Sequence, residues 1–136
     1  MNVVDTSGWV EFLFDEPNAG VFAPLIEDTG NLLVPVICLY EVFKKVNAVA
    51  DEPKALQAVA QMKQGRIVDV TETIALRAAL ISLKHRLPMA DSLILAAAWS
   101  ERATLWTQDE HFEGIPGVEY RQTVTKGNGR RAGPRR

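Results

Sequence analysis

Residues 3–7 read Val-Val-Asp-Thr-Ser, and this short stretch decides the fold. Its two valines end a predicted strand, Asp5 follows at once, and the two hydroxyl residues favour the start of a helix. Further apolar strand candidates lie at residues 32–34, 67–70, 104–106 and 118–120. Because these short strands alternate with helical stretches, the sequence predicts an α/β fold with a parallel sheet covered on both faces.

The stretches between the strands have helical periodicity. We expect helices over residues 9–14, 21–26, 36–50, 53–64, 71–84 and 88–101. Pro53 and Pro88 suit the first position of a helix, and Gly65 suits its end. The helix over 88–101 is apolar nearly all round between residues 93 and 99, which predicts that it is deeply buried.

Length and composition indicate one globular domain. The chain has 136 residues, of which 47% are hydrophobic and 24% charged, an ordinary balance for a single core. Its one cysteine, Cys38, lies in an apolar run and is expected to be a buried hydrophobic residue rather than a nucleophile. No apolar run approaches the roughly 20 residues that cross a bilayer, and no secretory signal is evident, so we expect a cytoplasmic protein without a membrane partner.

The charge is divided unevenly along the chain. Residues 1–120 hold all 17 acidic residues and nine Lys and Arg residues, whereas the last 16 residues hold six basic residues and no acid. We expect a domain over residues 1–124 and a basic, disordered tail over 125–136, which either adds affinity for RNA or only solubilises the chain. An acidic body repels phosphates, so a nucleic-acid enzyme of this composition requires a metal ion or a local basic patch.

Four acidic residues stand in unusual positions. Asp5 follows the first predicted strand and Asp109 lies just beyond the fourth, where parallel sheets place ligand groups. Glu41 interrupts an apolar run, and Asp91 lies in the first turn of the most apolar helix. Each acid alone is as readily a helix cap, a turn residue or the partner of a lysine. As a set directed into one cleft, they require a shared counter-charge, which a hard divalent cation supplies.

A cation of this kind indicates a class of reaction. Mg²⁺ or Mn²⁺ held by carboxylates polarises a phosphodiester and activates a water molecule, without a histidine or cysteine nucleophile. The only histidines, His85 and His111, have no evident set of partners in the sequence, so Ser-His-Asp and zinc sites fit poorly. No glycine-rich phosphate-binding loop is present in the sequence.

At these residues the sequence resembles the PIN-domain family and, within it, the VapC toxins of toxin–antitoxin pairs. The matching segments are residues 3–7, 39–42, 89–96 and 105–112, in family order. The resemblance implies a three-layer α/β/α sandwich with a five-stranded parallel sheet. It also implies a catalytic acidic pocket formed by Asp5, Glu41, Asp91 and Asp109. In that pocket Asp5, Asp91 and Asp109 are expected to bind Mg²⁺ or Mn²⁺, and Glu41 to bind the ion directly or to orient the attacking water.

The resemblance extends to supporting residues and partners. Thr6 and Thr107 match family positions whose hydroxyl groups assist the pocket. Lys44 and Lys45 are candidates for phosphate contacts, with pairing to nearby acids as the alternative. The family implies an endoribonuclease that forms homodimers and is neutralised by a cognate VapB-type antitoxin.

Three other kinds of protein could share these sequence features. A response-regulator receiver domain fits poorly, because Asp5 has no acidic neighbour and no lysine follows the strand at 104–106. A non-catalytic protein-binding or RNA-binding module on the same fold stays open. So does a DNA-directed nuclease, because no residue in the sequence can be assigned to reading the 2′-hydroxyl.

Overall fold

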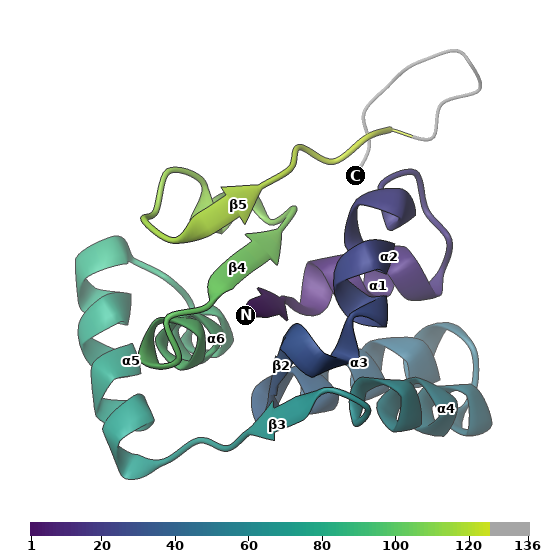
Figure 1. Ribbon diagram of the computed structural model, residues 1–136, viewed down its shortest axis with the longest axis horizontal. Coiled ribbons are helices and arrows are strands. Elements are labelled where there is room, and N and C mark those ends of the chain that lie inside the picture. The colour runs from purple at the N-terminus through teal and green to yellow at the C-terminus, as the bar shows by residue number, and fades with distance from the viewer. Residues whose placement is uncertain (126–136) are drawn as a thin grey trace.

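The computed structural model describes residues 1–125, and within them five parallel strands form one sheet (Figure 1). The strands are β1 (Asn2–Val4), β2 (Leu32–Pro35), β3 (Arg66–Val68), β4 (Thr104–Thr107) and β5 (Val118–Tyr120). Their order across the sheet is β3-β2-β1-β4-β5, and every neighbouring pair is parallel. The predicted α/β class and five-stranded parallel sheet are confirmed.

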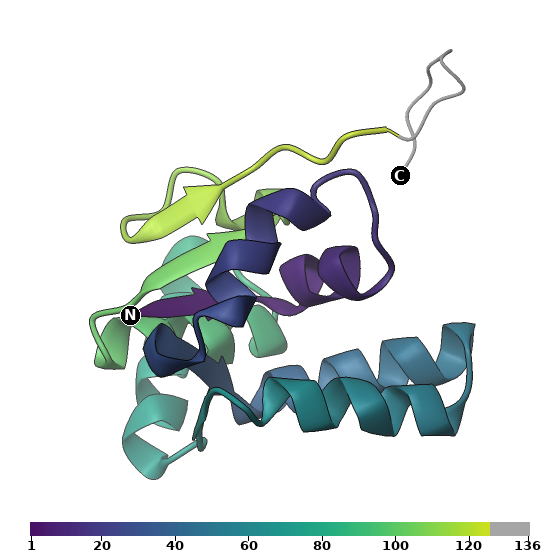
Figure 2. The same ribbon diagram turned by 45° about the vertical axis from the view of Figure 1, so that its right-hand side comes forward.

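Helices connect the strands and cover the sheet. The described residues contain α1 (Thr6–Leu13), α2 (Ala19–Glu27), α3 (Val36–Val49), α4 (Glu52–Met62), α5 (Glu72–His85) and α6 (Met89–Ser100), with short 3-10 helices η1 (Thr29–Asn31) and η2 (Glu110–Phe112). Helix α2 packs on β1, while α6 packs on β2 and β4 and is itself covered by α5. Helices α3 and α4 lie side by side as a hairpin that projects beyond the sheet (Figure 2).

The core lies where the central strands meet α6. Val3, Val4 and Leu105 are fully buried on β1 and β4, as expected for strands with helices on both faces. The predicted burial of α6 is confirmed, because Ile94, Leu95 and the three alanines that follow are at most 3% exposed. Cys38 is also buried, as predicted.

The third strand is shorter than predicted. The sequence indicated a strand over residues 67–70, but β3 ends at Val68 and the side chain of Val70 is 43% exposed. Strand β3 lies at the edge of the sheet and pairs only with β2, so pairing extends no further. Among the described residues that line the cleft below, none comes from the segment that directly follows β3.

Two further sequence expectations concern the C-terminal tail and membrane-spanning helices. From residue 126 on, the predicted basic tail lies outside the described residues. No helix in the described part of the chain has the length and apolar character needed to span a membrane.

Candidate metal centre

Asp5 forms the floor of the site. It directly follows β1 and is the N-cap of α1, where its Oδ1 accepts hydrogen bonds from the Gly8 backbone N–H at 3.0 Å and the Ser7 hydroxyl at 2.7 Å. Because β1 and β4 are hydrogen-bonded neighbours, Thr107 lies beside Asp5 and donates to its Oδ2 at 2.7 Å. The carboxylate is therefore held by three donors although it is only 2% exposed.

Thr107 links two of the predicted acids. Its hydroxyl oxygen, which donates to Asp5, also accepts the backbone N–H of Asp109 at 2.9 Å. Asp109 is in turn the N-cap of η2, with its Oδ1 accepting the backbone N–H of His111 at 3.0 Å. The loop after β4 is thereby fixed against the end of β1.

Glu41 reaches the site from the second turn of α3. The hydroxyl group of Thr6 donates to Glu41 Oε1 at 2.5 Å, which joins the start of α1 to α3. Lys44 and Lys45 follow on the same helix and line the cleft, and Lys44 Nζ lies 5.8 Å from the centre of the Tyr40 ring. Among the described residues neither lysine forms an ion pair with Glu41. The alternative interpretation, in which Lys44 and Lys45 pair with a nearby acid, is therefore not seen.

Asp91 reaches the site from the first turn of α6, and it meets Asp109 there. Both acids contact His111, whose Nδ1 lies 3.3 Å from Asp91 Oδ2 and 3.2 Å from Asp109 Oδ1. These three residues offer ligand atoms that all lie within 4.8 Å of one another. The expectation that His111 has no set of partners is wrong: the fold brings Asp91 to it from 20 residues away.

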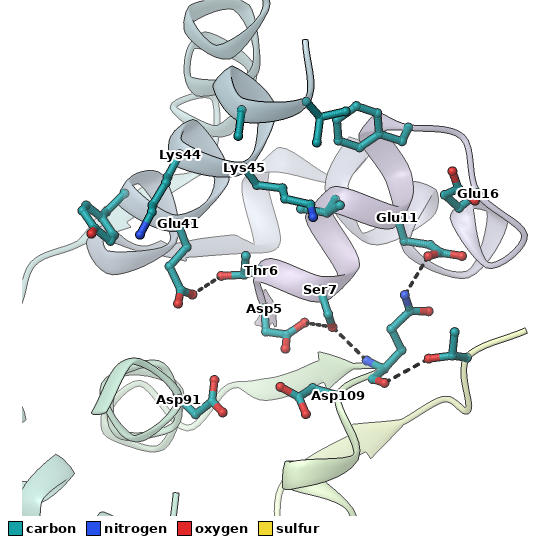
Figure 3. A pocket seen from close by; sticks show the side chains of 17 residues that line it. Asp5, Thr6, Ser7, Glu11, Glu16, Glu41, Lys44, Lys45, Asp91 and Asp109 are labelled. Carbon is teal, nitrogen blue, oxygen red and sulfur yellow. Dashed lines mark hydrogen bonds between the residues drawn. The ribbon is translucent and has the colours of Figure 1, made fainter. Parts of the chain in front are cut away.

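The four predicted acids come from four different segments and point toward one another (Figure 3). They line one open cleft of about 950 Å³, whose walls come from α1, α3 and the segments beyond β4. Thr6, Lys44 and Lys45 also line it, while Thr107 is fully buried beneath it. The fold thus gathers every residue that the sequence singled out as a site candidate.

Two of the carboxyl groups have raised pKa values, and burial is the main cause of both shifts. Burial raises the pKa of Asp5 from 3.8 to about 7, although the hydrogen bonds from Ser7, Thr107 and Gly8 lower it. Burial and then the neighbouring Asp109 raise the pKa of Asp91 to about 6. The same acids act on Cys38, whose thiol pKa is raised first by burial and then by Asp5. Each shift indicates a site that favours added positive charge.

A buried polar network beside the acids was missed from the sequence. Glu11, 5% exposed, accepts the backbone N–H of Asn18 at 2.7 Å and the side-chain amide of Gln108 at 2.6 Å. Ser7 accepts the backbone N–H of Gln108 at 3.1 Å. Glu11 interrupts the apolar run around Trp9 much as Glu41 interrupts its own run, and that signal was available.

The donor set fits a divalent cation. Carboxylate oxygens are the ligands that Mg²⁺ and Mn²⁺ prefer, and a bound cation offsets the burial that raises the pKa of Asp5 and Asp91. Asp5 lies outside the tightest group of ligand atoms, which consists of Asp91, Asp109 and His111. Its oxygens are already engaged by three donors, so a role on the floor of the site is as compatible with the geometry as direct ligation.

Comparisons with known proteins agree with this architecture. The family model described as the PIN domain matches residues 3–118. A toxin–antitoxin complex from Klebsiella pneumoniae contains a chain with 24% identity and a TM-score of 0.75, and the match covers 91% of this chain and 100% of that one. No curated protein sequence matches the chain.

Two further solved structures share the fold. One is VapC20 from Mycobacterium tuberculosis, described as a sarcin–ricin loop cleaving toxin, with 17% identity, a TM-score of 0.71 and coverage of 85% of this chain and 95% of that one. The other is FitAcB from Neisseria gonorrhoeae, with 25% identity, a TM-score of 0.62 and coverage of 82% and 89%. The structural neighbours therefore include VapC toxins of toxin–antitoxin systems.

Proposed function

The chain belongs to the PIN-domain family, and from that premise we propose that it is a divalent-metal-dependent endoribonuclease, the toxin of a VapBC-type pair. One observation carries the proposal: Asp5, Glu41, Asp91 and Asp109, scattered over the sequence, line a single cleft. A family neighbour described as a sarcin–ricin loop cleaving toxin supports RNA as the substrate. Mg²⁺ or Mn²⁺ is the proposed cofactor.

Asp5, Asp91 and Asp109 would hold a divalent cation, which would supply Lewis-acid chemistry: polarisation of the phosphodiester and a lowered pKa of the attacking water. The chain's own residues orient the pocket around that chemistry. Ser7, Gly8 and Thr107 hold the Asp5 carboxylate in one orientation. Thr6 directs Glu41 into the cleft, where Glu41 either binds the ion or accepts a proton from the attacking water.

Lys44 and Lys45 supply the positive charge that an acidic protein needs to approach RNA. Both are exposed on α3 and line the cleft beside Glu41 (Figure 3). Their ammonium groups are the proposed contacts for phosphates on either side of the scissile bond. Tyr40, whose side chain is 61% exposed, offers an aromatic face beside Lys44.

A second groove supports an antitoxin partner. It has a volume of about 620 Å³, runs between α3 and α4, and shares Tyr40, Lys44 and Ala48 with the acidic cleft. Its lining is largely apolar and includes Phe43 and Leu56. We propose that an amphipathic segment of a VapB-type antitoxin lies in this groove and directs an arginine into the acids. Co-expression with the product of the neighbouring open reading frame should then abolish cleavage.

The exposed face of α5 supports a homodimer. Leu76, Leu80 and Leu83 are 62%, 68% and 80% exposed, and they recur at helical spacing on the outside of the molecule. A contiguous apolar stripe of this kind marks an interaction surface more often than an isolated leucine does. We propose that two copies pack through this stripe, with the two α5 helices antiparallel.

An RNase assay tests the proposed activity. The wild-type protein should cleave RNA with Mg²⁺ or Mn²⁺ and lose cleavage in EDTA, and Asp91→Ala should reduce the rate well over tenfold, because stabilisation by a bound metal ion is worth several kcal/mol. Asp69→Asn is the matched control, since Asp69 lies outside the cleft. A wild-type protein that cleaves equally well in EDTA contradicts the proposal.

Metal titration separates the remaining alternative. A non-catalytic binding module on this fold would use the same acids only to dock a basic partner. Such a module would show neither cleavage nor stabilisation by Mn²⁺, whereas the proposed nuclease shows both. Parallel assays on single-stranded DNA establish the preference for RNA.

A further inference from the structure

We propose that His111 is a ligand of the metal in this site, and that its imidazole makes the site select Mn²⁺ and Co²⁺ over Mg²⁺. The inference rests on the proposed metal-dependent function and names the ion class that the site takes. It adds a nitrogen donor to a centre that the sequence presents as carboxylate alone.

The geometry places the imidazole among the carboxylates. His111 Nδ1 lies 3.3 Å from Asp91 Oδ2 and 3.2 Å from Asp109 Oδ1. Neighbouring ligands of one ion, each about 2.1 Å from it, are about 3.0 Å apart in octahedral and about 3.4 Å apart in tetrahedral geometry. Both distances from Nδ1 are thus those of neighbouring ligands on a common ion, and the three residues offer ligand atoms that lie within 4.8 Å of one another.

The start of η2 holds the backbone of His111 beside Asp109. The His111 N–H donates to Asp109 Oδ1 at the start of η2, and the next residue, Phe112, is fully buried. The side chain itself is 57% exposed, whereas Asp91 is 15% exposed. His111 therefore lies at the solvent-exposed rim of the site, and Asp91 lies deeper.

The nitrogen donor determines which cations the site prefers. Mg²⁺ binds oxygen ligands almost exclusively, whereas imidazole suits first-row transition metals, with affinity rising from Mn²⁺ to Co²⁺. Ligation requires that the Nδ1 hydrogen moves to Nε2 or leaves, so that the Nδ1 lone pair faces the ion. Two carboxylates and one imidazole are therefore a donor set for Mn²⁺ or Co²⁺ more than for Mg²⁺.

Calorimetric titration with each metal alone tests the inference without a nuclease assay. For His111→Ala we expect the Kd for Mn²⁺ to rise about tenfold or more and the Kd for Mg²⁺ to change less than about threefold. His85→Ala is the matched control, because His85 makes an edge-to-face contact with Trp99 outside the cleft, and it should leave both constants unchanged. An equal change in the two constants of His111→Ala overturns the inference.

A spectroscopic measurement on the wild-type protein gives an independent answer. With Co²⁺ bound, a ligated imidazole gives a hyperfine-shifted N–H proton resonance in NMR spectra, and this resonance should vanish in His111→Ala. A Co²⁺ complex of the folded wild-type protein without such a resonance overturns the inference.

The inference and the proposed nuclease function fail in different ways. If metal binding depends on His111 but the protein cleaves no RNA, His111 is a metal ligand and the proposed nuclease function is wrong. If wild type and His111→Ala cleave RNA equally in Mg²⁺ and in Mn²⁺ and bind both metals with equal affinity, the nuclease function stands and His111 is not a ligand.

Discussion

At the scale of single residues, Asp5 shows how the fold prepares a cation site. Three donors stabilise its charged form, yet burial outweighs them and raises the pKa to about 7. The neighbouring Asp109 adds repulsion, and it raises the pKa of Asp91 as well. Without a cation, the protein therefore spends free energy to keep this carboxylate ionised near neutral pH.

The stability of the metal-free protein should depend on Asp5 in a defined pH window. The pKa of Asp5 is about 7 in the folded chain, against an ordinary value of 3.8, so the folded state binds the proton more tightly than the unfolded state. Its contribution to the free energy of unfolding is full below pH 4 and is lost as the pH rises toward 7. Between pH 5 and pH 8 in EDTA, wild type should lose up to about 3 kcal/mol relative to Asp5→Asn, measured by urea unfolding.

Metal and control measurements complete this prediction. Adding Mn²⁺ at pH 8 should recover the lost stability in wild type and less of it in Asp5→Asn, because a ligand that binds only the folded state stabilises it. Asparagine keeps the helix cap, so the variant should fold. Parallel pH curves for the two proteins in EDTA would show that Asp5 is not the group responsible.

Among the elements, α1 owes its position to a glycine. A Cβ atom on Gly8 would lie 2.6 Å from Val4 Cγ1 and 2.8 Å from the ring of Phe22. The missing side chain lets α1 pack directly on β1 and α2, and the Gly8 N–H is one of the donors to Asp5. The close packing of this helix and the orientation of the acid are thus one arrangement.

A pair of glycine substitutions tests that packing. Gly8→Ala gains about 1 kcal/mol of helix propensity but overpacks the core at a cost of about 1–3 kcal/mol or more, and we expect net destabilisation of roughly 1–2 kcal/mol. Gly20→Ala on α2 meets nothing within 4 Å and should stabilise the protein by about 0.5–1 kcal/mol. Thermal unfolding measures both variants. A Gly8→Ala protein as stable as Gly20→Ala would contradict the packing account.

The elements themselves were largely predictable, because strands and helices here are short, apolar and separated by clear caps. All five strands and six helices lie where the sequence indicated, within a few residues. The error at β3 has a physical cause: an apolar pattern continues to Val70, but an edge strand has one partner and stops when that partner does. Strand length at an edge depends on a neighbour that is distant in sequence.

Part of the candidate site was predictable because the positions of the strand ends could be read from the sequence. Residues at strand ends, such as Asp5 and Asp109, follow from the topology of a parallel sheet. His111 lies only two residues beyond Asp109, yet its contact with Asp91 depends on how α6 meets the loop after β4. Glu11 finds its donors, Asn18 and Gln108, only once α1 lies beside that loop. Side-chain networks of this kind are set by tertiary packing, which no local pattern encodes.

At the scale of the whole molecule, α5 has an apolar face that remains exposed to solvent in a single copy of the chain. Its leucine stripe faces outward, with Glu72 in the first turn and Lys84 in the last. If two α5 helices pack antiparallel about a two-fold axis near residue 78, Leu76 of one copy meets Leu80 of the other. The same register brings Glu72 opposite Lys84 twice, so the charges at the helix ends complement one another.

Substitution of one leucine should therefore separate the copies without unfolding them. In Leu80→Glu the charge would be buried in the dimer but exposed in the monomer. We therefore expect the dissociation constant of the dimer to rise at least tenfold, while the free energy of unfolding of the monomer changes by no more than about 0.5 kcal/mol. Light scattering with size-exclusion chromatography measures the mass. Leu56→Glu on α4 is the matched control, because Leu56 is 55% exposed outside this stripe.

A charge exchange then tests the register of the two helices. Glu72→Lys alone places like charges together at both ends of the antiparallel pair and should weaken the dimer, and Lys84→Glu should do the same. The double variant restores opposite charges at both ends and should regain most of the wild-type affinity, because each new lysine again faces a glutamate. A parallel pair would not show this rescue, because Glu72 would lie opposite Glu72 of the other copy and Lys84 opposite Lys84 of the other copy. Failure of the double variant to recover, with Leu80→Glu still monomeric, would retain the stripe as the interface and reject the antiparallel register.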